Sequence, residues 1–297
     1  MTRAMAAAIA AFLVASPALA QRDFSSVEIK TVKVAEGLFM LEGAGGNIGL
    51  STGADGAFVI DDQYAPLSAK ILAAIKKETD APVEFVLNTH WHGDHTGGNE
   101  AFGAAGARIV AHENVRKRLK EGLTYASGHT TPPAPTGALP IITFSDRVTF
   151  YWNGQDIEAF HPAAAHTDGD AIIVFRTANV AHMGDIFFNG LYPFIDLESG
   201  GDLDGYIAAQ EAALAKIDDK TKVIPGHGPL AKKADLKTSA DMLKSVRARV
   251  KALIDAGKTE DEVVAAKPLA DLDAEWSWDF INGETMTRTA YRSLARK

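Results

Sequence analysis

One short stretch, THWHGDHTGG at 89–98, concentrates side chains that can bind metal ions. It directly follows a predicted strand, where residues two apart point the same way, so its first two histidines can bind one ion together. Gly93 lets the chain turn, so that the Asp and the third His can face a second point nearby. Imidazole and carboxylate groups suit zinc at neutral pH. The candidate ligands in this stretch are His90, His92, Asp94 and His95.

Two ligands from one strand do not complete a zinc site, which commonly has three protein ligands and one open position. Three later motifs offer further ligands, each at one end of a predicted strand and beside glycine, where the backbone can approach an ion. His166 is the best candidate for the third ligand, and Asp185 and His227 are further candidates. The motifs are AHTDGD at 165–170, MGD at 183–185 and PGHGP at 225–229.

Together these motifs resemble the metallo-β-lactamase superfamily of metal-dependent hydrolases. The resemblance spans nearly all of the chain after its first twenty residues, and it implies a four-layer αβ/βα sandwich with the metal site at one edge between two sheets. It also implies that Asp61, at the end of a predicted strand, supports a ligand histidine from behind. Two Zn²⁺ ions per chain are implied, one held by His90, His92 and His166, the other by Asp94, His95 and His227, with Asp185 bridging them.

Two cations held so close together suit hydrolysis. A water shared between them would lose its proton near neutral pH, because both positive charges stabilise hydroxide. That hydroxide would attack a carbonyl carbon, while the ion held by three histidines polarises the carbonyl oxygen and the other stabilises the leaving atom. We assign Asp94 the catalytic role of orienting the nucleophile, in addition to binding metal.

The residues around the ligands bear on the substrate. One β-lactamase subclass has Cys in place of Asp185, no His in place of His95, and a Lys where Phe188 stands here. The ligand set is closer to another β-lactamase subclass and to glyoxalase II. Glyoxalase II, however, usually has basic glutathione-binding residues and a different segment after its bridging Asp. The stretch 165–174 resembles that of secreted β-lactamases.

We therefore expect an exported zinc-dependent hydrolase that uses a metal-bridging hydroxide to open a cyclic amide, with a β-lactam as the leading substrate. The alternative is a lactonase or thioesterase, similar to glyoxalase II, on the same dizinc scaffold. A more distant alternative is an iron-dependent oxygenase, although diiron relatives usually have Glu where His92 stands. A non-catalytic binder is disfavoured because the ligand set is complete. The residues expected around the substrate are Phe188, Asn189 and Tyr192.

Hydrophobic periodicity predicts the elements that position these residues. A strand-rich start followed by mixed strands and helices, without a linker, indicates one α/β domain over 21–297. The Pro-rich segment 124–140 is predicted to be a loop that borders the binding site. Residues from about 234 to 297 are expected to pack outside the sandwich without a chemical role. Strands are predicted within 27–60 and at 83–89, 107–111, 141–144, 148–152, 157–160, 171–175, 180–182 and 222–225, and helices at 65–77, 113–123, 205–217 and 234–256.

Composition narrows the class of protein. The 297 residues are 46% hydrophobic and carry a formal net charge of −8, which is typical of a globular protein and disfavours a general nucleic-acid binder. With no Cys, the chain has no disulfide, thiolate ligand or Cys nucleophile.

The first twenty residues resemble a secretory leader: Arg3 precedes a short apolar run, and Ala18-Leu19-Ala20 is a cleavage signature. We expect a periplasmic or secreted protein with a small-molecule substrate, without nucleic acid or a membrane anchor. The other histidines, His112, His129, His161 and His182, receive no role.

Overall fold

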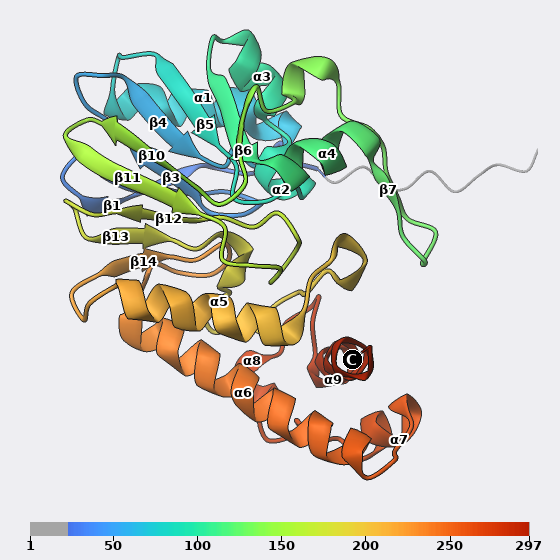
Figure 1. Cartoon of the computed structure of the whole chain (residues 1–297). Coiled ribbons are helices and arrows are strands. Elements are labelled where there is room, and N and C mark those ends of the chain that lie inside the picture. The colour runs from blue at the N-terminus through green and yellow to red at the C-terminus, as the bar shows by residue number, and fades with distance from the viewer. Residues whose placement is uncertain (1–22, 297) are drawn as a thin grey trace, which may run out of the picture.

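The structure is a computed structural model that describes residues 23–296. The predicted leader at 1–20 lies outside the described residues. Two β-sheets pack face to face, with helices on each outer surface (Figure 1). The predicted αβ/βα sandwich is therefore confirmed. In the part of the chain that is described, no helix is both long and apolar enough to cross a membrane.

The first sheet has seven strands in the order β1-β2-β3-β4-β5-β6-β9. Its first four strands form antiparallel hairpins, and from β4 onwards each neighbouring pair is parallel. Short turns join the hairpins, whereas the parallel strands need helical crossovers. The strands are β1 Lys30–Ala35, β2 Leu38–Glu42, β3 Ile48–Ser51, β4 Ala57–Ile60, β5 Val83–Leu87, β6 Arg108–His112 and β9 Ile142–Phe144.

The second sheet has six strands in the order β10-β11-β12-β13-β14-β15, and only the pair β13·β14 is parallel. A further hairpin, β7·β8, projects from the segment that was predicted to be a loop. The strands are β10 Arg147–Trp152, β11 Gln155–Phe160, β12 Ile172–Phe175, β13 Val180–His182, β14 Lys222–Ile224 and β15 Ala231–Lys232, with β7 Leu123–Thr124 and β8 Thr130–Thr131.

Helices form the two outer layers. In Figure 1, α1 and α3 lie beyond the first sheet, while α5 and the long α6 lie beyond the second. Short 3-10 helices join other elements, and they span Ala65–Leu67, Thr136–Ala138, Gly184–Ile186 and Leu197–Ser199. The α-helices are α1 Ser68–Glu78, α2 Gly93–Thr96, α3 Asn99–Ala104, α4 Glu113–Glu121, α5 Leu203–Lys216, α6 Lys233–Asp255, α7 Glu260–Ala265, α8 Asp273–Trp276 and α9 Gly283–Ala295.

Three apolar layers hold the sandwich together. The central layer joins the inner faces of the sheets, for example Phe58 and Leu87 against Ile157 and Phe175. Because alternate strand residues face opposite ways, Val59 and Val86 point outward and pack under α1. This burial, at roughly 25 cal/mol per Å² of apolar surface, provides the stability that a chain without disulfides requires. It also fixes the strand ends at the edge where the candidate ligands lie.

Candidate metal centre

The candidate ligands lie where strand ends from both sheets meet at one edge of the sandwich. Strands β5, β13 and β14 end there, and β12 begins there. Loops of the two sheets are tied together by a hydrogen bond from the backbone N–H of Asn47 to the carbonyl oxygen of Gly226, at 2.7 Å. Strand β5 ends shortly before His90, β13 before Asp185 and β14 before His227, whereas β12 begins shortly after His166.

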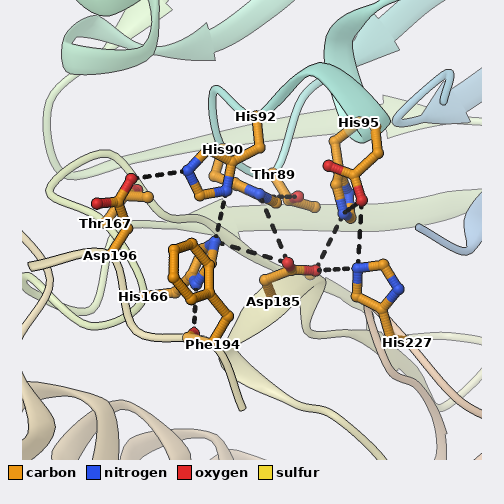
Figure 2. Close-up of polar contacts among 12 residues, drawn as sticks. Thr89, His90, His92, His95, His166, Thr167, Asp185, Phe194, Asp196 and His227 are labelled. Atoms are coloured by element: carbon orange, nitrogen blue, oxygen red, sulfur yellow. Dashed lines mark hydrogen bonds and ion pairs between the residues drawn. The ribbon is translucent and has the colours of Figure 1, made fainter. Parts of the chain in front are cut away.

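The first group of side chains comprises His90, His92, His166 and Asp185, whose potential ligand atoms all lie within 4.8 Å of one another (Figure 2). Nε2 of His166 lies 2.9 Å from Nδ1 of His92. Oδ2 of Asp185 lies 3.7 Å from Nε2 of His90 and 3.5 Å from Nε2 of His166. Three imidazole nitrogens and one carboxylate oxygen thus face a common centre.

The second group comprises Asp94, His95 and His227, again with ligand atoms within 4.8 Å of one another. Oδ1 of Asp185 reaches this group, at 3.0 Å from Nε2 of His95 and 3.4 Å from Nε2 of His227. Oδ2 of Asp94 lies 3.4 Å from Nε2 of His227. The two carboxylate oxygens of Asp185 therefore face different groups, as Figure 2 shows, which is the arrangement expected of a bridging ligand.

The donor atoms fit divalent metal ions. Nε2 of His90, Nε2 of His95 and Oδ1 of Asp185 are buried without a hydrogen-bond partner within the described chain. Buried polar atoms are nearly always satisfied, so such a cluster calls for an explanation, and an ion provides one. Imidazole and carboxylate donors match zinc and similar divalent metals.

Electrostatics favour neutral imidazoles at His90 and His166 and attract positive charge to the second group. Burial lowers the pKa of His90 well below its usual value and that of His166 to about 4. Burial acts in the same direction on His95 and His227, but the carboxylates, above all Asp185, outweigh it and raise both pKa values, that of His227 to about 9. Metal ligands must be deprotonated, so bound cations would replace these protons.

Asp61 and Thr89 support the histidines from behind. Asp61 is buried and has a φ of 62°, in the left-handed region that is uncommon for residues other than glycine. Its Oδ2 lies 2.7 Å from Nδ1 of His95 and also accepts a hydrogen bond from the Thr89 hydroxyl, at 2.7 Å. Oγ1 of Thr89 in turn lies 3.0 Å from Nδ1 of His90. The predicted contact of Asp61 with a candidate ligand is present, and it leaves Nε2 of His95 free to face the cluster.

Asp196 supports the cluster from the other side, and sequence reasoning missed it. Its Oδ2 lies 2.9 Å from Nε2 of His92, which leaves Nδ1 of His92 to face the cluster. The same oxygen accepts hydrogen bonds from the Tyr125 hydroxyl, at 3.0 Å, and from the Ser199 hydroxyl. Nδ1 of His166 lies 2.8 Å from the carbonyl oxygen of Phe194. No local motif links Asp196 to His92, which is 104 positions away, so only the fold reveals this partner.

Two glycines allow the backbone to approach the cluster. A Cβ atom at Gly226 would overlap Oδ1 of Asp185, and one at Gly46 would overlap the ring of His95. The PGHGP motif therefore requires its first glycine for a steric reason. Close approach of the backbone was predicted beside the ligands for this reason, whereas the role of Gly46 was not predicted.

A cavity of about 950 Å³ opens beside the cluster. Phe188 lines it, as predicted, and so does the β7–β8 hairpin of the segment 124–140. The histidine His129, which received no role, also lines this cavity. The lining residues are Ala44, Tyr64, His92, Gly93, Asp94, Tyr125, Ser127, His129, Thr131, Asp185, Phe188, Phe194, His227, Trp278 and Phe280.

Two expectations about the surroundings of the site are wrong. Asn189 does not line the cavity, because its side-chain amide donates to the carbonyl oxygen of Pro229, at 2.9 Å. Tyr192 is fully buried in the core, where its hydroxyl bonds Oδ1 of Asp273 at 3.3 Å. The chain beyond residue 234 does pack outside the second sheet, but Trp278 and Phe280 return to line the cavity.

The remaining histidines lie outside the cluster. His182 is buried, with Nε2 at 3.0 Å from the carbonyl oxygen of Asn47. The rings of His112 and His161 stack on each other with centroids 4.1 Å apart. Trp91, which lies between two candidate ligands in sequence, points away from them and donates to the Ser199 hydroxyl at 3.1 Å.

Comparison with known families agrees with this architecture. The family model described as "Metallo-beta-lactamase superfamily" matches residues 42–227, more than half of the chain. The chain belongs to the metallo-beta-lactamase superfamily. It therefore has the fold of a superfamily of metal-dependent hydrolases, and its His/Asp cluster fits the divalent metal ions on which such hydrolases depend.

Sequence relatives within the superfamily carry different names. A hydroxyacylglutathione hydrolase of Nitrosococcus oceani is 28% identical over 168 residues, which cover 54% of this chain and 55% of that protein. A metallo-beta-lactamase type 2 of a Bacillus species is 23% identical over 190 residues, covering 64% of this chain and 69% of that protein. The chain spans about half the length of the hydroxyacylglutathione hydrolases that it matches, 55% and 47%.

Solved structures of the superfamily share the fold. A metallo-beta-lactamase from Pontibacter korlensis has a TM-score of 0.61 and 21% identity, covering 73% of this chain and 99% of that one. The sec-alkylsulfatase Pisa1 from a Pseudomonas species has a TM-score of 0.67 and 19% identity, covering 89% of this chain and 50% of that one. At this level of identity the likeness concerns the fold alone.

Proposed function

We propose that the protein is an exported, zinc-dependent hydrolase that opens a cyclic amide, with a β-lactam as the leading substrate. The observation that carries this proposal is the position of Asp185, whose two oxygens face two separate groups of potential ligands. The groups would hold two Zn²⁺ ions, one at His90, His92 and His166, the other at Asp94, His95 and His227. When bound, the ions would supply an activated water and an electrophile for the substrate carbonyl.

The side chains of the chain itself would prepare the reaction. Burial raises the pKa of Asp94, but the charges of His95 and His227 outweigh it and lower this pKa to about 2, so the carboxylate is ionised at neutral pH. Asp94 is half-buried and lines the cavity. It is thus placed to accept a hydrogen bond from a water molecule and to orient that water toward a substrate carbonyl. The aromatic cavity beside it would exclude bulk water from the reacting groups.

The test is a hydrolysis screen with the purified, zinc-loaded protein against penicillins, cephalosporins and carbapenems. We expect turnover of at least one class and its loss in Asp94→Ala, by on the order of 10²-fold or more, because this change removes the group that orients the nucleophile. Absence of turnover across the three classes would refute the β-lactam assignment. Activity that survives in Asp94→Ala would refute the role of Asp94.

A lactonase or thioesterase is the second candidate, and one observation favours it. None of the described residues that line the cavity is Lys or Arg, so no such side chain there would pair with the ring carboxylate of a β-lactam. The hydroxyacylglutathione hydrolases among the relatives also support this candidate, because an acylglutathione is a thioester. Lactone and thioester panels would then give much higher values of kcat/KM than the β-lactams.

Export is the part of the proposal that rests on the sequence of the leader. Cell fractionation should place the protein in the periplasm or the medium, and N-terminal sequencing should find Gln21 as its first residue. Recovery of the uncut chain from the cytoplasm would contradict export while leaving the proposed chemistry unaffected.

A further inference from the structure

Four aromatic rings form one continuous surface of the cavity. The centroids of Phe188 and Trp278 lie 6.1 Å apart, those of Trp278 and Phe280 lie 5.6 Å apart, and those of Phe280 and Phe194 lie 5.5 Å apart. These distances are typical of aromatic pairs in contact. We call these four residues the aromatic wall.

The inner end of the aromatic wall touches the candidate metal centre. The ring of Phe188 stacks on that of His227, with centroids 4.8 Å apart and planes inclined by 23°. The ring of Phe194 lies 5.8 Å from that of His166. A substrate whose carbonyl lies at the cluster would therefore have its neighbouring substituent against these rings.

The outer end of the wall is held by the buried residue Tyr192. Its backbone N–H donates to the carbonyl oxygen of Trp276, at 2.7 Å, and its own carbonyl oxygen accepts from Nε1 of Trp278, at 2.9 Å. These bonds fix the segment after α8 across the cavity. At the rim Phe280 remains 59% exposed, so a ligand that covered it would gain the free energy of burying an apolar ring.

The cavity beside the aromatic wall presents no strongly positive side chain to a substituent of the substrate. Among the described residues that line the cavity, the two carboxylates, Asp94 and Asp185, belong to the cluster, and none is Lys or Arg. Away from the cluster, the lining side chain that can be positively charged is His129, which is exposed on the β7–β8 hairpin. A carboxylate placed against the wall would lose hydration without gaining a strong partner.

We propose that the aromatic wall is a specificity site that binds an uncharged aromatic or branched aliphatic substituent next to the scissile carbonyl. The orientation of the substrate rests on the proposed hydrolase function, whereas the affinity of the wall for an uncharged aromatic group does not. Phe280 and Trp278 are the residues that determine this specificity. Tyr192 acts through them as a positioning residue.

The binding test uses a neutral aromatic dye, N-phenyl-1-naphthylamine, whose fluorescence rises in an apolar site. The zinc-loaded protein is titrated alongside Phe280→Ser and Trp278→Ala, with Tyr151→Ser as the control, since Tyr151 is 77% exposed on β10 and does not line the cavity. We expect the Kd to rise about tenfold in each wall variant and to stay unchanged in the control. An unchanged Kd in both wall variants, or no binding to the wild type, would overturn the proposal.

The turnover test uses a matched pair of substrates. Benzylpenicillin and α-carboxybenzylpenicillin differ by one carboxylate on the benzyl side chain, and α-phenyl-γ-butyrolactone with its 4-carboxyphenyl analogue provides the same comparison for lactones. We expect kcat/KM to be about tenfold higher for the uncharged member, and this ratio to fall in Phe280→Ser. Equal values in the wild type would overturn the proposal. Absence of any hydrolysis would refute the proposed function, while the dye titration would still test the wall.

Discussion

Oδ2 of Asp61 lies 2.7 Å from Nδ1 of His95, and both side chains are fully buried. This contact decides which ring nitrogen of His95 carries the proton. When a metal ion replaces the second proton of His95, Nδ1 still donates to the carboxylate, and the lone pair of Nε2, which lies 3.0 Å from Oδ1 of Asp185, is left for the ion. A residue that binds no metal itself would thus set the chemistry of a ligand in the second group.

Replacing this carboxylate by its amide should weaken metal binding. Asn tolerates the positive φ of position 61, so Asp61→Asn should fold. An amide NH₂ group in place of Oδ2 would face a donor at Nδ1 of His95 and favour the other tautomer, which places a proton on Nε2. We expect zinc affinity to fall about 10- to 100-fold. Titration against a competing chelator measures this, with the exposed Asp55→Asn as the control, and equal affinities would refute the role of Asp61.

Gly226 should tolerate no side chain. A Cβ atom there would overlap Oδ1 of Asp185, so Gly226→Ala has to displace the bridging carboxylate. A displacement of about 1 Å costs on the order of 10²-fold in rate, and we expect at least that loss in kcat/KM. Gly137→Ala is the control, because a Cβ atom there would meet its nearest neighbour at 3.7 Å. Equal activity in the two variants would show that the ligand position is not critical.

Asp170 should make stability depend on pH. Burial raises the pKa of Asp170 to about 7, even though Thr167 donates two hydrogen bonds to the carboxylate. In the unfolded chain the pKa is about 3.9, so the folded state favours the protonated form. The resulting stabilisation is complete below pH 4 and is lost as the pH rises through 7. Metal-free wild type should therefore lose about 1 kcal/mol between pH 6 and 8, relative to Asp170→Asn. Urea denaturation measures both proteins, and parallel pH profiles would contradict the prediction.

Asp196 should be needed for tight metal binding by the first group of ligands. It fixes His92 through Nε2 and links this histidine to Tyr125 on the β7–β8 hairpin. Asp196→Ala should lower the affinity of one zinc ion about 10- to 100-fold, whereas Tyr125→Phe should have a smaller effect because His92 keeps its partner. The comparison of the two variants by chelator titration separates the role of the carboxylate from that of the hairpin. Identical losses of zinc affinity in the two variants would contradict a separate role for the Asp196 carboxylate.

The sequence predicted the strands that position the ligands and the convergence of those ligands, but only part of their surroundings. Periodicity located the strands that end before His90, Asp185 and His227, because buried parallel strands have a distinct pattern. Partners such as Asp196 were not predictable, since a lone Asp in a loop has no periodic signal. Tyr192 was misplaced because nearness in sequence to Asp185 does not determine which way a side chain points. Trp278 and Phe280 reach the cavity through the path of the C-terminal chain, which the helix pattern does not specify.

The central claim is that seven side chains hold two divalent ions, and the stoichiometry of zinc tests it most directly. Metal-free protein is loaded with Zn²⁺, passed through a desalting column and analysed by mass spectrometry for bound metal, alongside His166→Ala and His227→Ala, which each remove one ligand from a different group. We predict two zinc ions per wild-type chain and one tightly bound ion in each variant. Binding of one ion or none by the wild type, or retention of two by both variants, would contradict the account.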